Sequence, residues 1–245
     1  MITIPLIVVL ASALILLGLI FLRRRSPAIL RPIKAFENLN KAIGLSVEDG
    51  SRLHISLGRG SLLTARGGSA LAGLAMLRRI AERASVSDNP PIVTSGDASL
   101  ALLSQDTLQA GYQAAGAEDQ YRLNTGRLTG LTPFSYAAGT IPVIRDENAS
   151  TNIIMGDFGP EVALIAEAAD RENTFLMAAS DNVSAQAVLY ASSHDFLVGE
   201  ELFASGAYVG AGPSHDASLQ TQDILRWVII LALVGGSLMK LFRLI

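Results

Sequence analysis

The sequence predicts a Rossmann-like α/β fold, with a parallel sheet that contains an internal duplication and with a transmembrane helix at each end. Three observations lead to this prediction. Strand-like and helix-like runs alternate through the middle of the chain, one series of features occurs twice, and both ends are apolar. Strands separated by helices form right-handed crossover units, which give a parallel sheet covered on both faces.

The N-terminal apolar segment, residues 2–22, contains no charged residue. As a helix it would be about 31 Å long, which matches the hydrocarbon core of a bilayer. Arg23, Arg24 and Arg25 follow it, whereas a cleaved signal peptide carries its positive charge before the apolar run. We therefore expect residues 1–22 to span a membrane and the three arginines to contact lipid headgroups on its cytoplasmic side.

The C-terminal apolar segment, residues 224–245, gives a weaker signal because its uncharged core covers only residues 227–239. Lys240 and Arg243 can extend the span by reaching to the far interface. Residues 234–237 are small enough to let another helix approach closely. A helix on the membrane surface is the alternative, but its apolar residues would then form one stripe. We predict a two-pass protein of the inner (plasma) membrane with a cytoplasmic central domain.

Charge is distributed unevenly along the chain. Eight of the 19 basic residues flank the apolar segments, which leaves 11 of them against all 22 acidic residues in between. A domain with this excess of negative charge repels the phosphate backbone of nucleic acids. Nucleic-acid binding is therefore disfavoured. The chain has no cysteine, which excludes disulfides and thiolate metal sites.

The region between the apolar segments divides into three parts. Residues 23–50 form a basic juxtamembrane segment and an amphipathic helix, because Ile29, Ile33, Phe36 and Ile43 recur at helical spacing. Residues 51–212 form the α/β domain, and the polar residues 213–223 form a linker. The partners of the whole protein are expected to be the lipid bilayer, further copies of the chain and, in one alternative, a larger membrane complex.

The α/β domain repeats a series of strand, glycine turn, helix, strand, Ser/Asp turn and helix. The first copy has strands at 52–57 and 92–94, with helices at 68–84 and from Asp97 to about residue 115. The second copy has strands at 151–155 and 174–179, with helices beginning at Pro160, with Glu161 in its first turn, and at Asp181. Between the copies, residues 139–144 are predicted as an edge strand, because Pro142 would be excluded from a central one.

Ligands of such folds bind at the carboxyl ends of the strands, where the strand order reverses. The predicted turns there supply the candidate ligand-binding residues Gly58, Gly60, Ser95, Asp97, Asp157, Ser180 and Asp181. Three carboxylates and two serines could surround a small polar ligand or a hard cation. The alternative is purely structural, because aspartates in these positions cap helices.

Known catalytic and cofactor patterns do not fit. The dinucleotide pattern G-x-G-x-x-G requires glycine where the chain has Leu63, and no Walker lysine follows. Arg59 and Arg66 could touch an anion, although arginines in such turns are more often solvated. His54 shares the polar face of its strand with Arg52, which favours a surface histidine over a general base. We therefore predict no catalytic residue, metal or cofactor.

Two stretches resemble an uncharacterised family of bacterial membrane proteins that carry a domain of unknown function. They are AFENLNKAIGLSVEDGSRLHISLG at 35–58 and VGEELFASGAY at 198–208. The resemblance implies a membrane-bound α/β protein and supplies no catalytic residue.

Our leading hypothesis is a non-enzymatic scaffold that is anchored in a membrane, self-associates and presents its α/β domain to the cytoplasm. One alternative is a module that binds a nucleotide-like anion, or acts on it, at the strand ends. Another alternative is an accessory subunit of a larger membrane complex.

Overall fold

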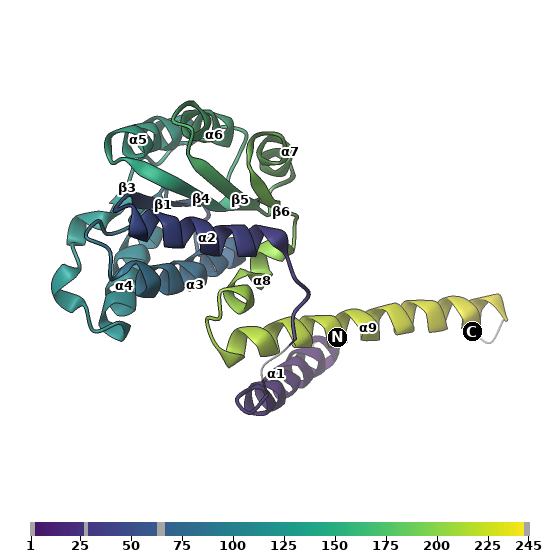
Figure 1. The fold of residues 1–245 in the computed structure, drawn as a ribbon. Helices are drawn as coiled ribbons and strands as arrows, with labels where there is room; N and C mark the ends of the chain where they lie inside the picture. Colours follow the sequence, from purple (N-terminus) through teal and green to yellow (C-terminus); the bar gives the residue numbers. More distant parts are fainter. Residues whose placement is uncertain (1–2, 27–28, 63–66, 243–245) are drawn as a thin grey trace. The chain divides into compact units, whose positions relative to one another are not determined.

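A computed structural model of the protein describes residues 3–26, 29–62 and 67–242. The chain divides into two compact units. One unit is the continuous segment Arg31–Gly210, and the other combines Met1–Leu30 with Ala211–Ile245. The first unit contains the sheet, and the second contains the two apolar helices (Figure 1).

Within the described residues, six parallel strands form one sheet. They are β1 (Arg52–Gly58), β2 (Ile92–Ser95), β3 (Gly126–Leu128), β4 (Ala149–Asp157), β5 (Phe175–Ser180) and β6 (Asp195–Leu197). Their order across the sheet is β3-β2-β1-β4-β5-β6, so the direction of winding reverses between β1 and β4. This is the doubly wound order of dinucleotide-binding folds, and it confirms the predicted Rossmann-like class.

Two halves of the sheet contain the same series of elements. The first runs β1-α3-β2-α4-β3 and the second runs β4-α6-β5-α7-β6, with α5 joining them. The helices are α3 (Gly67–Ala84), α4 (Ala98–Ala114), α5 (Pro133–Asp146), α6 (Val162–Arg171) and α7 (Val183–Ser192). The repeat predicted from the sequence therefore exists as a repeat of structure.

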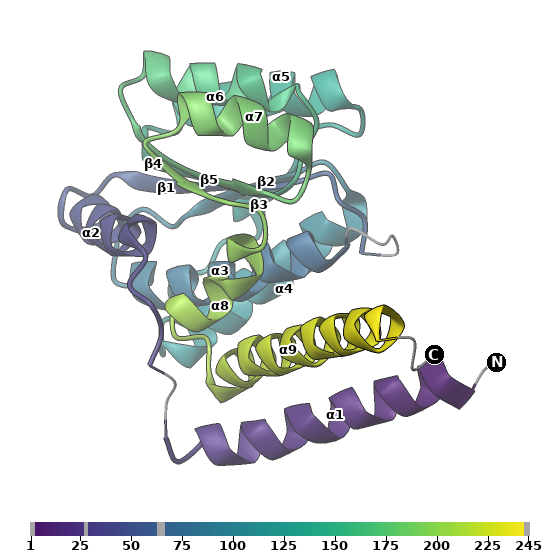
Figure 2. The same cartoon turned by 90° about the vertical axis from the view of Figure 1, so that its right-hand side faces the viewer.

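Helices cover both faces of the sheet. One face carries α5, α6 and α7, and the other carries α3, α4 and the short helix α8 (Glu201–Tyr208) (Figure 2). Beneath α5–α7 the core includes Ile154, Phe158 and Ile165, each no more than 1% exposed. Helix α2 (Lys34–Glu48) packs on the sheet unit through Phe36, whose ring stacks on Tyr208 with centroids 4.6 Å apart.

The predicted edge strand at 139–144 is wrong, because these residues lie in α5. A capping box begins this helix: the Thr132 hydroxyl accepts from the Ser135 main-chain N–H, and the Ser135 hydroxyl accepts from the Thr132 N–H. Pro133 occupies the first turn, where a missing N–H is tolerated. Pro142 is then accommodated inside an established helix, whereas the sequence argument considered it only in a strand.

The second unit contains two helices that are long and apolar enough to cross a membrane, α1 (Thr3–Arg23) and α9 (Pro213–Leu241). They pack against each other, and Arg23 Nε donates to Gln220 Oε1 at 2.8 Å. Arg25 lies over the Phe21 ring, while Arg24 is exposed. The predicted linker at 213–223 is instead the first part of α9, and Arg243 lies outside the described residues.

Candidate functional site

The candidate site lies at the carboxyl ends of β1 and β4, where the strand order reverses. Gly58 ends β1 beside Asp157, which ends β4, and the next main-chain N–H, that of Arg59, donates to Asp157 O at 2.9 Å. Gly58 has a φ of +75°, and a Cβ there would lie 2.3 Å from Asp157 O. Only glycine fits this turn, because both the left-handed backbone and the close approach exclude a side chain.

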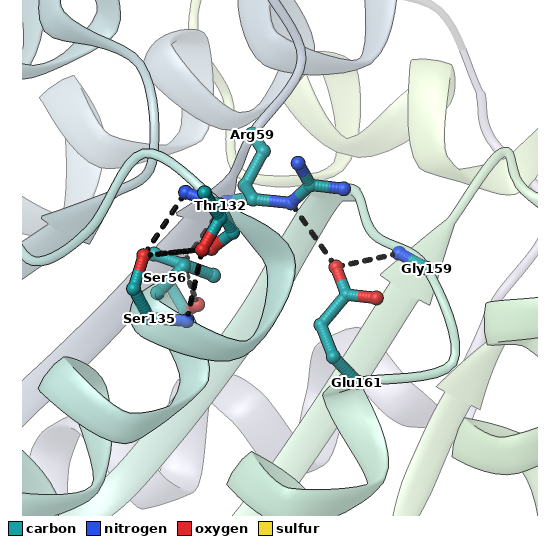
Figure 3. A network of polar contacts seen from close by, with 8 residues as sticks. Ser56, Arg59, Thr132, Ser135, Gly159 and Glu161 are labelled. Atoms are coloured by element: carbon teal, nitrogen blue, oxygen red, sulfur yellow. Dashed lines mark hydrogen bonds and ion pairs between the residues drawn. The ribbon is translucent and has the colours of Figure 1, made fainter.

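An ion pair joins the two turns across this point. Arg59 Nε lies 3.1 Å from Glu161 Oε1, and the Gly159 N–H donates to the same oxygen at 3.0 Å (Figure 3). The Glu161 side chain is only 2% exposed, whereas that of Arg59 is 27% exposed. A buried carboxylate requires such partners, since its desolvation would otherwise favour the neutral acid.

The aliphatic part of Arg59 runs over the turn after β2. A Cβ on Gly96 would lie 2.3 Å from Arg59 Cγ, and the Gly96 N–H donates to Gly58 O at 2.9 Å. The turn after β2 therefore needs a glycine in order to make room for the arginine. As a result, the Arg59 guanidinium and the Glu161 carboxylate occupy the switch point between β1 and β4.

A buried tyrosine from α5 contacts the end of β1 at this edge. The hydroxyl of Tyr136 lies 2.5 Å from Ser56 Oγ and accepts from the Gly58 N–H at 3.3 Å. Burial raises the pKa of Tyr136, so the phenol is neutral at physiological pH. Helix α5 begins at the same edge with the Thr132–Ser135 capping box (Figure 3), and its tyrosine bonds to both Ser56 and Gly58 at the end of β1.

A family model describing a domain of unknown function, DUF6754, matches residues 1–245. The chain belongs to the DUF6754 family. This confirms the resemblance to an uncharacterised family that the sequence suggested. Neither the curated proteins nor the solved structures contain a match to the chain.

In this DUF6754 chain, the sequence-predicted ligand residues lie along one edge but not around one point. Asp97 caps α4, with its carboxylate accepting from Leu100 N at 3.1 Å and from the Ser99 hydroxyl. Ser95 is buried, and its hydroxyl lies within hydrogen-bond reach of Asp97 O in its own turn and of Arg127 O in the neighbouring strand β3. Gly60 is buried after the Arg59 turn. No group of three described acidic or histidine side chains lies close enough to hold a metal.

At the turn after β5 the helix begins one residue later than predicted. The cap of α7 is Asn182, whose side chain accepts from Ser184 N at 3.1 Å, so the expected capping role of Asp181 is wrong. Ser180 Oγ accepts from Asn182 N at 3.3 Å and supports the same turn. Sequence reasoning chose the acidic neighbour because aspartate and asparagine cap helices equally well.

His54 was expected at the surface, but it is fully buried. Its Nδ1 lies 2.8 Å from Asn152 Oδ1 and its Nε2 lies 2.9 Å from Thr94 Oγ1. The Asn152 amide in turn donates to Thr174 Oγ1 at 2.7 Å. The prediction failed because β1 is central and covered on both faces, so its polar residues face buried partners in neighbouring strands rather than water. Burial lowers the pKa of His54 to about 4.

The DUF6754 sequence contains a signal for the pairing of Arg59 with Glu161. The arginine lies in a glycine turn, and the glutamate lies at a helix start. Opposite charges on the equivalent turns of two repeats indicate a pair, because these turns meet where the strand order reverses. Arg66 and Leu63 lie outside the described residues.

Open hollows are also present away from this edge. One of about 380 Å³ lies between α2 and the first residues of β4 and β5, and its lining includes Leu45, Ser46 and Phe175. Another, of about 370 Å³, lies between α5 and α6 and is rimmed by Arg145 and Arg171. Neither contains a residue that the sequence predicted as a ligand.

Proposed function

We propose that the protein is a non-enzymatic scaffold of the inner membrane that self-associates and presents its α/β unit to the cytoplasm. Two helices of sufficient length and apolarity support a two-pass anchor. Arg23, Arg24 and Arg25 support a cytoplasmic location for the end of α1, because basic residues favour that side and can meet lipid headgroups there. The polar residues at the strand ends have structural roles such as the capping of α4 by Asp97, which supports a non-catalytic role.

The observation that carries self-association is the open space beside the glycines of the anchor. A Cβ on Gly18, Gly235 or Gly236 would meet no atom within 4 Å. The contact between α1 and α9 therefore does not use these positions. Small residues in membrane helices allow backbones to approach closely, and their unused faces are suited to a helix of a second copy.

The glycine faces can be tested in mild detergent. We expect the full chain to form oligomers, and Gly235→Leu/Gly236→Leu to shift the distribution toward the monomer in size-exclusion chromatography with light scattering. Val234→Leu is the matched control, because this neighbouring residue already carries an exposed branched side chain. It should leave the distribution unchanged.

A wild-type chain that remains monomeric at all concentrations would contradict self-association. If that monomer co-purifies with another protein from native membranes, the role of an accessory subunit replaces that of the scaffold. Orientation needs a separate measurement: protease added to intact cells should leave residues 31–210 undigested. Digestion there would place the α/β unit outside the cell.

A further inference from the structure

The Arg59–Glu161 pair occupies the place where doubly wound folds bind their ligands. The strand order 3-2-1-4-5-6 reverses between β1 and β4, and folds of this order bind their ligands outside the carboxyl ends of the strands at that point. The charged side chain that lies there, over Gly96, is a guanidinium rather than a carboxylate. Arginine presents five N–H donors in a planar fork that matches the oxygens of carboxylates and phosphates.

We propose that Arg59, together with the Gly159 main-chain N–H, binds a phosphate-bearing anion at the switch point, in competition with Glu161. This site goes beyond the scaffold role and does not depend on self-association.

The Glu161 carboxylate indicates the chemistry of the ligand. One oxygen, Oε1, accepts from both Arg59 Nε and Gly159 N, at 3.1 and 3.0 Å. A guanidinium and a main-chain N–H that converge on one anionic oxygen form the donor arrangement of a phosphate site. The internal carboxylate therefore occupies the position that a ligand oxygen would take.

The geometry also leaves the arginine accessible. Its side chain is 27% exposed, while that of Glu161 is 2% exposed. Arg59 bonds to Glu161 through Nε, and Figure 3 draws no bond from either Nη atom to Glu161. Solvent therefore reaches the guanidinium, and a phosphate that replaces the Glu161 oxygen can approach from that side.

Two variants separate the role of the Arg59 guanidinium from that of the Glu161 carboxylate. Glu161→Gln keeps an oxygen acceptor for Arg59 and Gly159 but removes the competing charge. Arg59→Gln/Glu161→Gln differs from it only at the arginine, and it leaves no unpaired buried charge. In calorimetric titrations of the full chain in detergent with inorganic phosphate and with adenosine monophosphate, we expect Glu161→Gln to bind about tenfold more tightly than the wild type. The double variant should lose this binding.

The control and the source of the phosphate are tested in the same series. Glu167→Gln removes an exposed carboxylate paired with Arg171, and it should leave the affinity unchanged. A short-chain phosphatidate titrated in parallel distinguishes a lipid phosphate from a soluble one: tighter binding of the lipid assigns the site to a headgroup. Equal binding by Glu161→Gln and the double variant, or no binding by either, would overturn the proposal.

A measurement on the wild type does not depend on how the variants fold. Phenylglyoxal modifies accessible arginines, and mass spectrometry reports the modified positions. We expect saturating phosphate to slow modification of Arg59 several-fold while Arg171 reacts at its usual rate. Unchanged modification of Arg59 under these conditions would contradict the site.

Discussion

The two halves of the sheet share the order of their elements but differ in the polar side chains they carry. β1 and β4 pair in parallel, with His54 opposite Asn152. The turn after β1 supplies Arg59, whereas the turn after β4 supplies Glu161. The order of elements that the two halves share therefore determines the course of the backbone. The side chains in which the halves differ determine the polar contacts between them.

This divergence matters because equivalent positions meet where the halves join. If both turns carried arginine, or both carried glutamate, two like charges would face each other between the ends of β1 and β4. Their repulsion would lower the folding stability. Unlike residues instead give an ion pair at the edge and a hydrogen bond between neighbouring strands. The comparison can be sharpened by removing one member of each pair.

The largest expected effect concerns His54 and pH. Unfolded histidine titrates near its ordinary value of 6.5, while the folded pKa is about 4. Between these values the unfolded state binds more protons, so stability falls as the pH falls. The full difference is on the order of 3 kcal/mol, and about 2 kcal/mol of it should be lost between pH 7 and pH 5. Thermal unfolding of the full chain, followed by circular dichroism, measures this loss.

His54→Gln is the comparison for that measurement, because glutamine can still bond to Thr94 or Asn152 but does not titrate. Its stability should change less between pH 7 and pH 5 than that of the wild type. If the two chains lose the same stability, the acid sensitivity comes from other groups.

The next effect concerns the ion pair between Arg59 and Glu161. Arg59→Met leaves the Glu161 carboxylate buried with only the Gly159 N–H, and it should cost about 2 kcal/mol of folding stability at pH 7. Arg171→Met removes an arginine from an exposed pair with Glu167 and should cost under about 1 kcal/mol. Equal losses in thermal unfolding would show that the Arg59–Glu161 pair behaves as a surface pair.

The smallest effect distinguishes the helix caps of the two halves. Asp97→Ala and Asn182→Ala should each cost about 1 kcal/mol, because each leaves a first-turn N–H without its side-chain acceptor. Asp97→Asn should cost only a few tenths of about 1 kcal/mol of folding stability, since asparagine also caps helices. A large loss from Asp97→Asn would indicate that the charge of Asp97 has a role beyond capping.

Much of the fold follows from local patterns in the sequence. The long strands and helices gave clear periodic signals, and Asp97 was correctly predicted at the start of α4. The strands β3 and β6 were missed because three residues are too few to show a period of two. The strand predicted at residues 139–144 is wrong because the prediction rested on Pro142 and did not use the Thr132–Ser135 capping box that begins a helix upstream.

The candidate site was predicted less well than the fold, because it depends on contacts between distant segments. Gly58 and Asp157 were placed at the correct edge, but the pairing of Arg59 with Glu161 spans 102 positions. His54 shows the same limit: alternation along one strand cannot reveal that the neighbouring strands offer Asn152 and Thr94 as partners.

The bond between His54 and Asn152 links residues from different repeats at the centre of the molecule. Neither half, produced as a separate fragment, would contain both partners, so each fragment would bury or expose a polar group that the other normally satisfies. The repeated halves are thus mutually dependent, and an ancestral or engineered half would need different side chains along its joining strand in order to exist alone.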